Sequence, residues 1–241
     1  MKKRMTAFLA LTMLLLLLAG CGSRQTNSPA APVQESAAPE SAAQENAVQE
    51  STQPVQQLEE TDSSQPVSDT LVIYFSRTGE QYDVGVIEKG NTAIVAEIIA
   101  EETGADTFEI LPEADTYPTT YKELTEFAKQ EQNDKARPAI AGPIPDLTGY
   151  RRVFIGAPVW WGDWPMILYT FFETADLSGK QLIPFSTHAG SGLSGFDSKL
   201  AAACPDSAVL EGLAIRGVDA QKDPEGVRAD VEQWLARIDE Q

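Results

Sequence analysis

The stretch Val153-Phe154-Ile155-Gly156-Ala157-Pro158-Val159-Trp160-Trp161-Gly162-Asp163-Trp164-Pro165 decides how this chain is interpreted. Its first three residues are large and apolar, which predicts a short strand buried on both faces. We expect Gly156 and Pro158 to end this strand, so that three tryptophans follow in a loop at its carboxyl end. In open α/β sheets, ligands bind along that edge. The stretch therefore predicts an aromatic platform for a flat ring or, alternatively, tryptophans that cap the hydrophobic core.

Residues 1–20 have the features of a secretory signal peptide. A basic start is followed by an apolar run from Ala7 to Leu18, which is shorter than the about 20 residues that span a membrane. Leu18-Ala19-Gly20-Cys21 then resembles the lipobox of bacterial lipoproteins. This resemblance implies cleavage before Cys21 and lipid on its thiol, which would anchor the protein at the outer face of the bacterial cytoplasmic membrane. The alternative is an ordinary signal peptide followed by a chance cysteine.

Residues 21–68, which begin with the lipidated Cys21, predict a disordered tether. They are rich in Ala, Gln, Glu, Ser and Pro and contain no aromatic residue, so they cannot bury enough apolar surface to offset the entropy of ordering. Residues 69–241 suit a single domain. With Cys21 carrying lipid, Cys204 has no partner for an internal disulfide. A single histidine also leaves no Cys/His spacing that would predict a metal site.

Strand-like and helical patterns alternate along residues 69–241, which predicts a parallel sheet covered by helices on both faces. We expect strands at 70–75, 107–111, 152–155, 181–186 and 208–215. We expect helices at 91–103, 121–132, 165–174, 196–203 and 224–238. In such a sheet, the loops that follow the first, third and fourth strands come together at one edge.

The first of these loops predicts a phosphate site. Ser76-Arg77-Thr78-Gly79 follows the first strand, and after an insertion at 80–89 the polar pattern resumes with Asn91-Thr92 at a helix start. Hydroxyls and the free N–H groups of a helix N-terminus together favour an anion. An ordinary turn is the alternative. The loop after the fourth strand, 186–192, is small and rich in Gly and Ser, and it could bring backbone amides close to a ring edge.

These loops resemble those of the flavodoxins. Ser76-Arg77-Thr78-Gly79 with Asn91-Thr92 is similar to their phosphate loop, and Trp161-Gly162-Asp163 is similar to the loop that holds their isoalloxazine ring. The resemblance extends from about residue 70 to the C-terminus. It implies a doubly wound, five-stranded parallel sheet of order 2-1-3-4-5 and non-covalent FMN. The implied FMN-binding residues are Ser76, Arg77, Thr78, Gly79, Asn91, Thr92, Pro158, Val159, Trp160, Trp161, Gly162, Asp163, Ser186, Thr187, His188, Gly190 and Ser191.

The resemblance also implies individual roles. Trp161 or Trp160 would stack on the ring, and Gly162 would lie beside flavin N5, in a peptide that can reorient because glycine tolerates positive φ. Asp163 would lower the potential of the reduced flavin by charge repulsion, or would be an ordinary solvated turn acid. His188 would titrate together with the reduced flavin, or would simply face solvent from its loop.

The sequence departs from the flavodoxin pattern in two places. The insertion at 80–89 interrupts the phosphate loop, and its Tyr82 either covers the flavin, marks a partner surface or belongs to a simple surface excursion. The third loop lacks the aromatic residue that often covers the outer face of the flavin.

The formal net charge of −18 at pH 7 excludes nucleic acid as a partner. It favours basic redox partner proteins, either soluble or membrane-bound. Our first hypothesis is a membrane-anchored, extracytoplasmic FMN electron-transfer protein. The second is an FMN-dependent quinone or NAD(P)H oxidoreductase, with Tyr82, Tyr117 or Tyr121 shaping a substrate pocket. The third is a surface binding module with a vestigial flavin site.

Overall fold

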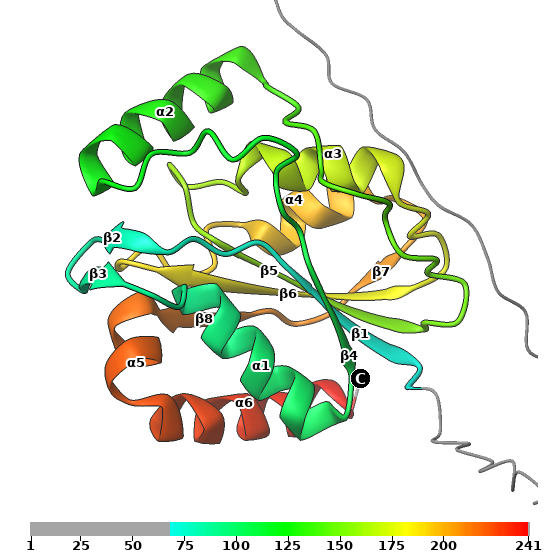
Figure 1. Cartoon of the computed structure of the whole chain (residues 1–241). Helices are drawn as coiled ribbons and strands as arrows, with labels where there is room; N and C mark the ends of the chain where they lie inside the picture. The colour runs from blue at the N-terminus through cyan, green and yellow to red at the C-terminus, as the bar shows by residue number, and fades with distance from the viewer. Residues whose placement is uncertain (1–67, 241) are drawn as a thin grey trace, which may run out of the picture. The chain divides into compact units, whose positions relative to one another are not determined.

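The computed structural model describes residues 68–240, which form a parallel sheet between two layers of helices (Figure 1). The strand order is β4-β1-β5-β6-β7, and β8 also pairs with β6. The strands are β1 (Thr70–Tyr74), β4 (Asp106–Glu109), β5 (Arg152–Pro158), β6 (Gln181–His188), β7 (Ala208–Val209) and β8 (Leu213–Arg216). With β7 and β8 taken as two parts of one strand, the predicted order 2-1-3-4-5 is confirmed. The predicted signal peptide, Cys21 and the tether lie outside the described residues.

Three helices cover each face of the sheet. On one face lie α1 (Asn91–Thr103), α5 (Gly217–Lys222) and α6 (Pro224–Ile238), and on the other lie α2 (Tyr121–Asp134), α3 (Met166–Thr174) and α4 (Phe196–Ala203) (Figure 1). Within residues 68–240, no helix is both long and apolar enough to cross a membrane.

Alternation along the central strands creates a separate core on each face. In β1, Leu71 and Ile73 pack beneath α2, α3 and α4, whereas Val72 packs against α1 and α6. In β5, Phe154 points to the α6 side and contacts Trp234 at 5.5 Å between ring centroids. Because successive side chains of a strand point to opposite faces, the continuous apolar runs in the sequence match a sheet that is buried on both sides.

β5 and β6 are longer than predicted. Gly156 does not end β5, which continues to Pro158, and Thr187 and His188 belong to β6 and not to a loop. The two strands stay paired as far as Pro158 opposite Thr187. Gly156 is tolerated because Phe185 lies across it: a Cβ at that position would come within 2.0 Å of the phenyl ring. The glycine therefore makes room for a core side chain and does not interrupt the strand.

The predicted fifth strand, 208–215, is divided in two. β7 pairs with Gln181 and Leu182, and β8 pairs with β6 from Phe185 onward. Between them lies Pro184 of β6, which has no N–H for the ladder. The carbonyl of Pro184 would be 2.9 Å from a Cβ at Gly212. The pairing with β6 is therefore interrupted near Pro184 and resumes at Phe185.

Two short elements were not expected. The insertion forms an antiparallel hairpin of β2 (Gly79–Gln81) and β3 (Gly85–Ile87), and the six-residue helix α5 directly follows β8. Both are too short to produce a clear hydrophobic period, so pattern analysis could not find them.

Candidate functional site

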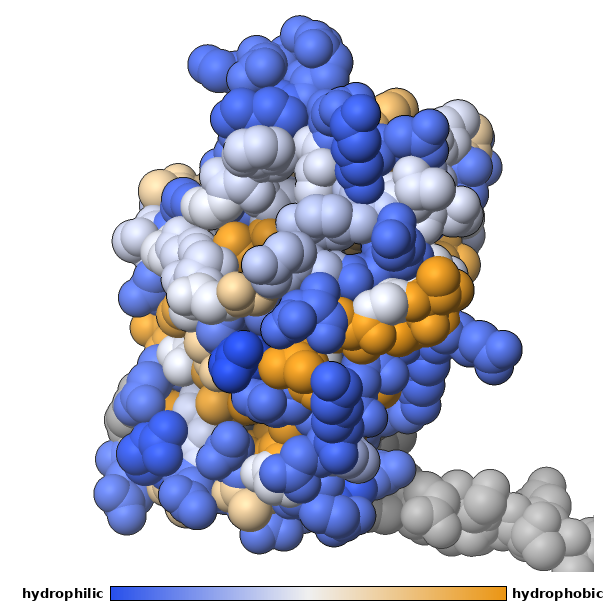
Figure 2. Space-filling model, turned by 90° about the vertical axis from the view of Figure 1, so that its left-hand side faces the viewer, coloured by the Kyte–Doolittle hydropathy of each residue, from blue (hydrophilic) through white to orange (hydrophobic). Residues whose placement is uncertain are grey.

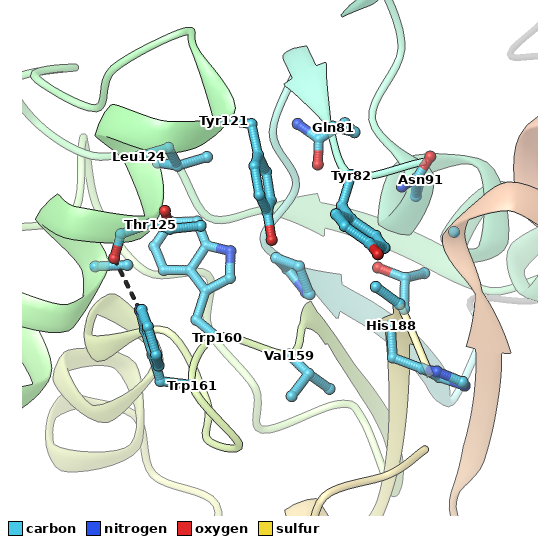
Figure 3. Close-up of a pocket in the computed structure, with 15 residues that line it drawn as sticks. Gln81, Tyr82, Asn91, Tyr121, Leu124, Thr125, Val159, Trp160, Trp161 and His188 are labelled. Carbon is cyan, nitrogen blue, oxygen red and sulfur yellow. Dashed lines mark hydrogen bonds between the residues drawn. The ribbon is translucent and has the colours of Figure 1, made fainter. Parts of the chain in front are cut away.

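A cavity of about 300 Å³ lies at the carboxyl ends of β5 and β6. Seven predicted residues line it: Asn91, Pro158, Val159, Trp160, Trp161, Thr187 and His188. Eight others complete the wall: Gln81, Tyr82, Tyr121, Leu124, Thr125, Ala128, Ala189 and Gly217. In Figure 3, Trp160 and Trp161 lie towards one side of this cavity and Asn91 and His188 towards the other, with Tyr121 and Tyr82 between them. The cavity therefore has an aromatic end and a polar end.

A tight turn distributes the aromatic residues of the loop after β5. Trp160 and Asp163 exchange two backbone hydrogen bonds of 3.0 Å, and φ is 52° at Trp161 and 73° at Gly162. Positive φ at both central positions defines a type I′ turn, in which glycine is readily accommodated. Gly162 thus has the positive φ that was expected of it, whereas its predicted role beside the flavin stays a prediction. Neither Gly162 nor Asp163 lines the cavity.

The three tryptophans have different environments. Trp164 is 1% exposed and stacks on Phe196 at 3.6 Å between centroids. Trp160 is partly buried, with its ring edge-on to Phe75 at 5.5 Å. Trp161 is 54% exposed. Core capping thus describes Trp164, whereas Trp161 is open to a ligand.

Helix α2 holds Trp161 in place. The indole Nε1–H of Trp161 donates to the carbonyl of Thr125 at 2.8 Å (Figure 3). The ammonium of Lys129 lies 5.0 Å from the centroid of the same ring. The α2 residues in the cavity wall, Tyr121, Leu124, Thr125 and Ala128, are spaced i, i+3, i+4 and i+7. That spacing is the sequence signal that could have identified this wall.

The carboxylate of Asp163 is engaged within the protein. Its Oδ1 accepts from the backbone N–H of Trp164 at 2.8 Å and from the hydroxyl of Tyr169 at 2.9 Å. The ammonium of Lys199 lies 3.3 Å away and also donates to the carbonyl of Gly162. Asp163 is therefore a partly buried, charge-compensated residue that fixes the turn, and it is not a solvated turn acid.

The two halves of the predicted phosphate loop meet despite the insertion. The hydroxyl of Ser76 accepts from the N–H of Ala93 at 3.1 Å, and a Cβ at Gly90 would lie 2.1 Å from that hydroxyl oxygen. The first N–H groups of α1, at Asn91 and Thr92, have no partner within the helix and carry partial positive charge. Loop and helix start therefore lie side by side, and of the six predicted phosphate-binding residues only Asn91 lines the cavity. Binding of an anion there stays a prediction.

Other residues of this loop have structural partners. The side chain of Thr92 is buried, and its hydroxyl bonds that of Thr187 at 2.8 Å, which joins α1 to β6. The guanidinium of Arg77 donates to both oxygens of Asp115 at 2.8 and 2.9 Å. Thr78 accepts at its carbonyl from the Gln81 amide at 3.3 Å. The Arg77 side chain is thus directed to the loop before α2, not to the start of α1.

The inserted hairpin contributes to the cavity. Glu80 donates its N–H to the carbonyl of Thr119 at 2.8 Å, and its carboxylate accepts from the N–H of Tyr121 at 2.8 Å. Glu80 thereby caps α2, a role that the Thr120 side chain does not fill. The rings of Tyr82 and Tyr121 consequently lie 5.6 Å apart at the cavity mouth. The interpretation of the insertion as a simple surface excursion is therefore wrong.

The segment after β6 is folded back on the strand end. Ser186 is buried and donates its hydroxyl to the carbonyl of Gly192 at 3.2 Å. Gly190 has φ of 125° and donates its N–H to Nδ1 of His188 at 2.9 Å. The carbonyl of Ser191 accepts from the hydroxyl of Ser194 at 3.2 Å. Ser186, Gly190 and Ser191 thus shape this segment without lining the cavity.

His188 is held as a neutral ring with a defined tautomer. Because Nδ1 accepts from Gly190, the ring proton resides on Nε2. Burial and the nearby positive charge of Arg216 lower the pKa of His188, whereas Asp219 acts in the opposite direction. The side chain therefore presents an uncharged N–H donor near neutral pH.

Comparisons with known proteins agree with this geometry. A family model described as flavodoxin matches residues 70–236. A crystal structure of a candidate flavoprotein from Bacteroides uniformis ATCC 8492 is 30% identical, with 69% of this chain and 97% of that chain covered and a TM-score of 0.56. A second, from Bacteroides eggerthii DSM 20697, is 31% identical, with 70% and 96% covered and a TM-score of 0.55. A search of curated proteins gives no match. Since the family model spans most of the chain, the chain belongs to the flavodoxin family.

Proposed function

We propose that this protein binds FMN non-covalently and transfers electrons outside the cytoplasmic membrane, to which lipid on Cys21 anchors it. The observation that carries the proposal is the cavity with an aromatic end at Trp160 and Trp161 and a polar end at the start of α1. FMN has the same polarity, with a flat ring at one end and a phosphate at the other.

The residues of the site fit FMN. The exposed indole of Trp161 and the ring of Tyr121 offer faces for the isoalloxazine. The first turn of α1 and the amide of Asn91 offer N–H groups for the phosphate. When bound, FMN supplies the ring that accepts and releases electrons. The protein would hold that ring against Trp161, and His188 would offer it a neutral N–H donor.

The full-length purified protein tests the proposal. Its visible spectrum and flavin content, before and after addition of FMN, report binding, and a reductive titration reports whether the bound flavin exchanges electrons. We expect stoichiometric FMN and a reversible titration. A protein that binds neither FMN nor riboflavin would instead be a surface module with a vestigial site, and the proposal would fail.

The tyrosine pair at the cavity mouth favours one alternative, an FMN-dependent quinone or NAD(P)H oxidoreductase. Tyr82 is 56% exposed and Tyr121 is 38% exposed, so both could contact a flat substrate above the flavin. Tyr117 cannot do so, because it is 6% exposed and packs edge-on against Trp160. Rapid oxidation of NAD(P)H with a quinone as acceptor, lost in Tyr82→Ala, would favour this enzyme over a carrier.

The face that carries the cavity suits contact with a redox partner. Figure 2, viewed from the side on which α2, the β2–β3 hairpin and α5 lie in Figure 1, shows apolar patches framed by hydrophilic surface. The exposed side chains of Tyr82, Val86, Tyr121 and Trp161 belong to the hairpin, the start of α2 and the turn after β5. With a net charge of −18, basic partners would be favoured.

A further inference from the structure

Gln221, on the short helix α5, contacts the start of α1. Its amide nitrogen donates to the carbonyl of Lys89 at 2.8 Å and to Oδ1 of Asn91 at 2.9 Å. The contact reaches the cavity through Asn91, which lines the cavity, as does Gly217 at the start of α5. The contact was not anticipated, since α5 itself was missed.

These two bonds determine which way the Asn91 amide faces. A backbone carbonyl can only accept, so the Gln221 group facing Lys89 must be the NH₂. The same NH₂ faces Asn91, so the Asn91 atom there must be the oxygen. The NH₂ of Asn91 is therefore turned the other way, and no acceptor for it lies within the part of the chain that the structure describes.

Gly217 leaves space for that NH₂. A Cβ at Gly217 would lie 2.4 Å from Nδ2 of Asn91, so any larger residue would push the amide aside. Asn91 is only half-buried, and its side chain borders the polar end of the cavity (Figure 3). A donor with fixed orientation is thus held at the N-terminus of α1, where an anion is also favoured.

We propose that Gln221 is a positioning residue that turns the Asn91 amide so that its NH₂ donates to the phosphate of FMN. This rests on the proposed function. A phosphate offers only acceptor oxygens, so an Asn91 amide in the reverse orientation would repel it. Gln221 therefore makes the site selective for FMN over riboflavin, which lacks the phosphate.

The test compares FMN and riboflavin affinities of the full-length protein by quenching of flavin fluorescence. Gln221→Leu frees the Asn91 amide and should weaken FMN about 10-fold, the scale of one hydrogen bond to a charged group, with riboflavin unchanged. Gln221→Glu should weaken FMN more, because a carboxylate attracts the Asn91 NH₂ and turns the oxygen towards the phosphate. Gln233→Glu, an exposed position on α6, controls for added charge alone.

Two further variants separate positioning from a structural role. In an Asn91→Ala background, Gln221→Leu should weaken FMN no further, because the residue through which it acts is gone. Asn91→Asp keeps an acceptor for Gln221 and should preserve the melting temperature while it selectively weakens FMN.

The inference is overturned if Gln221→Leu leaves FMN affinity unchanged or weakens both flavins equally. It is also overturned if the loss persists in the Asn91→Ala background. Wild-type protein that binds neither flavin would instead refute the proposed function, an outcome that the wild-type titration reveals before any variant is measured.

Discussion

Truncation of Trp161 separates a ligand platform from a core side chain. In the protein without flavin, Trp161→Ala removes the hydrogen bond to Thr125, worth about 0.5–1.5 kcal/mol, and the contact with Lys129, worth about 0.5–1 kcal/mol at an exposed site. Because the indole is 54% exposed, its removal leaves no enclosed cavity, which is what makes core truncations so destabilising. We therefore expect a loss of about 1–2.5 kcal/mol of unfolding free energy.

Trp164→Ala is the matched control from the same turn. Trp164 is 1% exposed and stacked on Phe196, so its truncation should cost about 3–5 kcal/mol. The flavin affinities should show the reverse order. Trp161→Ala should weaken FMN by about 1–3 kcal/mol, the scale of aromatic stacking on flat bases, or roughly 5- to 150-fold.

The assay combines urea unfolding of the flavin-free protein with flavin titrations. Trp161 acts on the ring and not on the phosphate, so FMN and riboflavin should weaken equally, in contrast to the Gln221 variants. If Trp161→Ala left both affinities unchanged while destabilising the protein as much as Trp164→Ala, the platform assignment would be refuted.

Three further predictions concern the site and the anchor. Thr92→Val should cost about 1–3 kcal/mol by leaving the buried Thr187 hydroxyl unpaired, whereas the double valine variant should recover most of that loss; urea unfolding of both variants checks this. The pKa of His188 lies below the usual 6.5 in the folded protein. As the pH drops, the unfolded chain therefore binds a proton at His188 before the folded protein does. The free energy of unfolding should accordingly fall between pH 6.5 and the folded-state pKa. NMR titration should show that pKa rising in Arg216→Gln, and an unchanged value would contradict the cause given. Cys21→Ser should abolish incorporation of labelled fatty acid, and equal labelling of the variant would refute lipidation at this residue.

The architecture could be predicted because runs of apolar residues indicate buried strands and apolar residues at helical spacing indicate the buried faces of helices. The run at 153–155 identified β5, and the resemblance of the loops to those of the flavodoxins implied the sheet order. Its end was predicted too early, because Gly156 was interpreted as a breaker. What keeps Gly156 in the strand is the pairing with β6 and the ring of Phe185. Neither is visible in local sequence.

Only half of the cavity could be predicted, for a related reason. The residues that follow β5 and β6 are found from strand position alone, since parallel strands place their carboxyl ends together. The other wall depends on how α2 and α5 dock onto the rest of the domain. That docking depends on single contacts between residues distant in sequence, such as Glu80 with Tyr121 and Gln221 with Asn91. Such contacts leave no periodic pattern in the sequence from which they could be predicted.

The structure of the insertion shows how such a wall can be present while the loop at 76–79 keeps its contact with the start of α1. The chain leaves the loop at Gly79 and returns at Gly90, and Gly90 approaches Ser76 and Arg77 so closely that any Cβ would clash. The two ends of the hairpin therefore lie close together, and the hydroxyl of Ser76 still accepts a hydrogen bond from the first turn of α1. Tyr82 reaches the cavity mouth while the start of α1 keeps its geometry. On this argument, both the geometry at the start of α1 and the added tyrosine wall depend on Gly90.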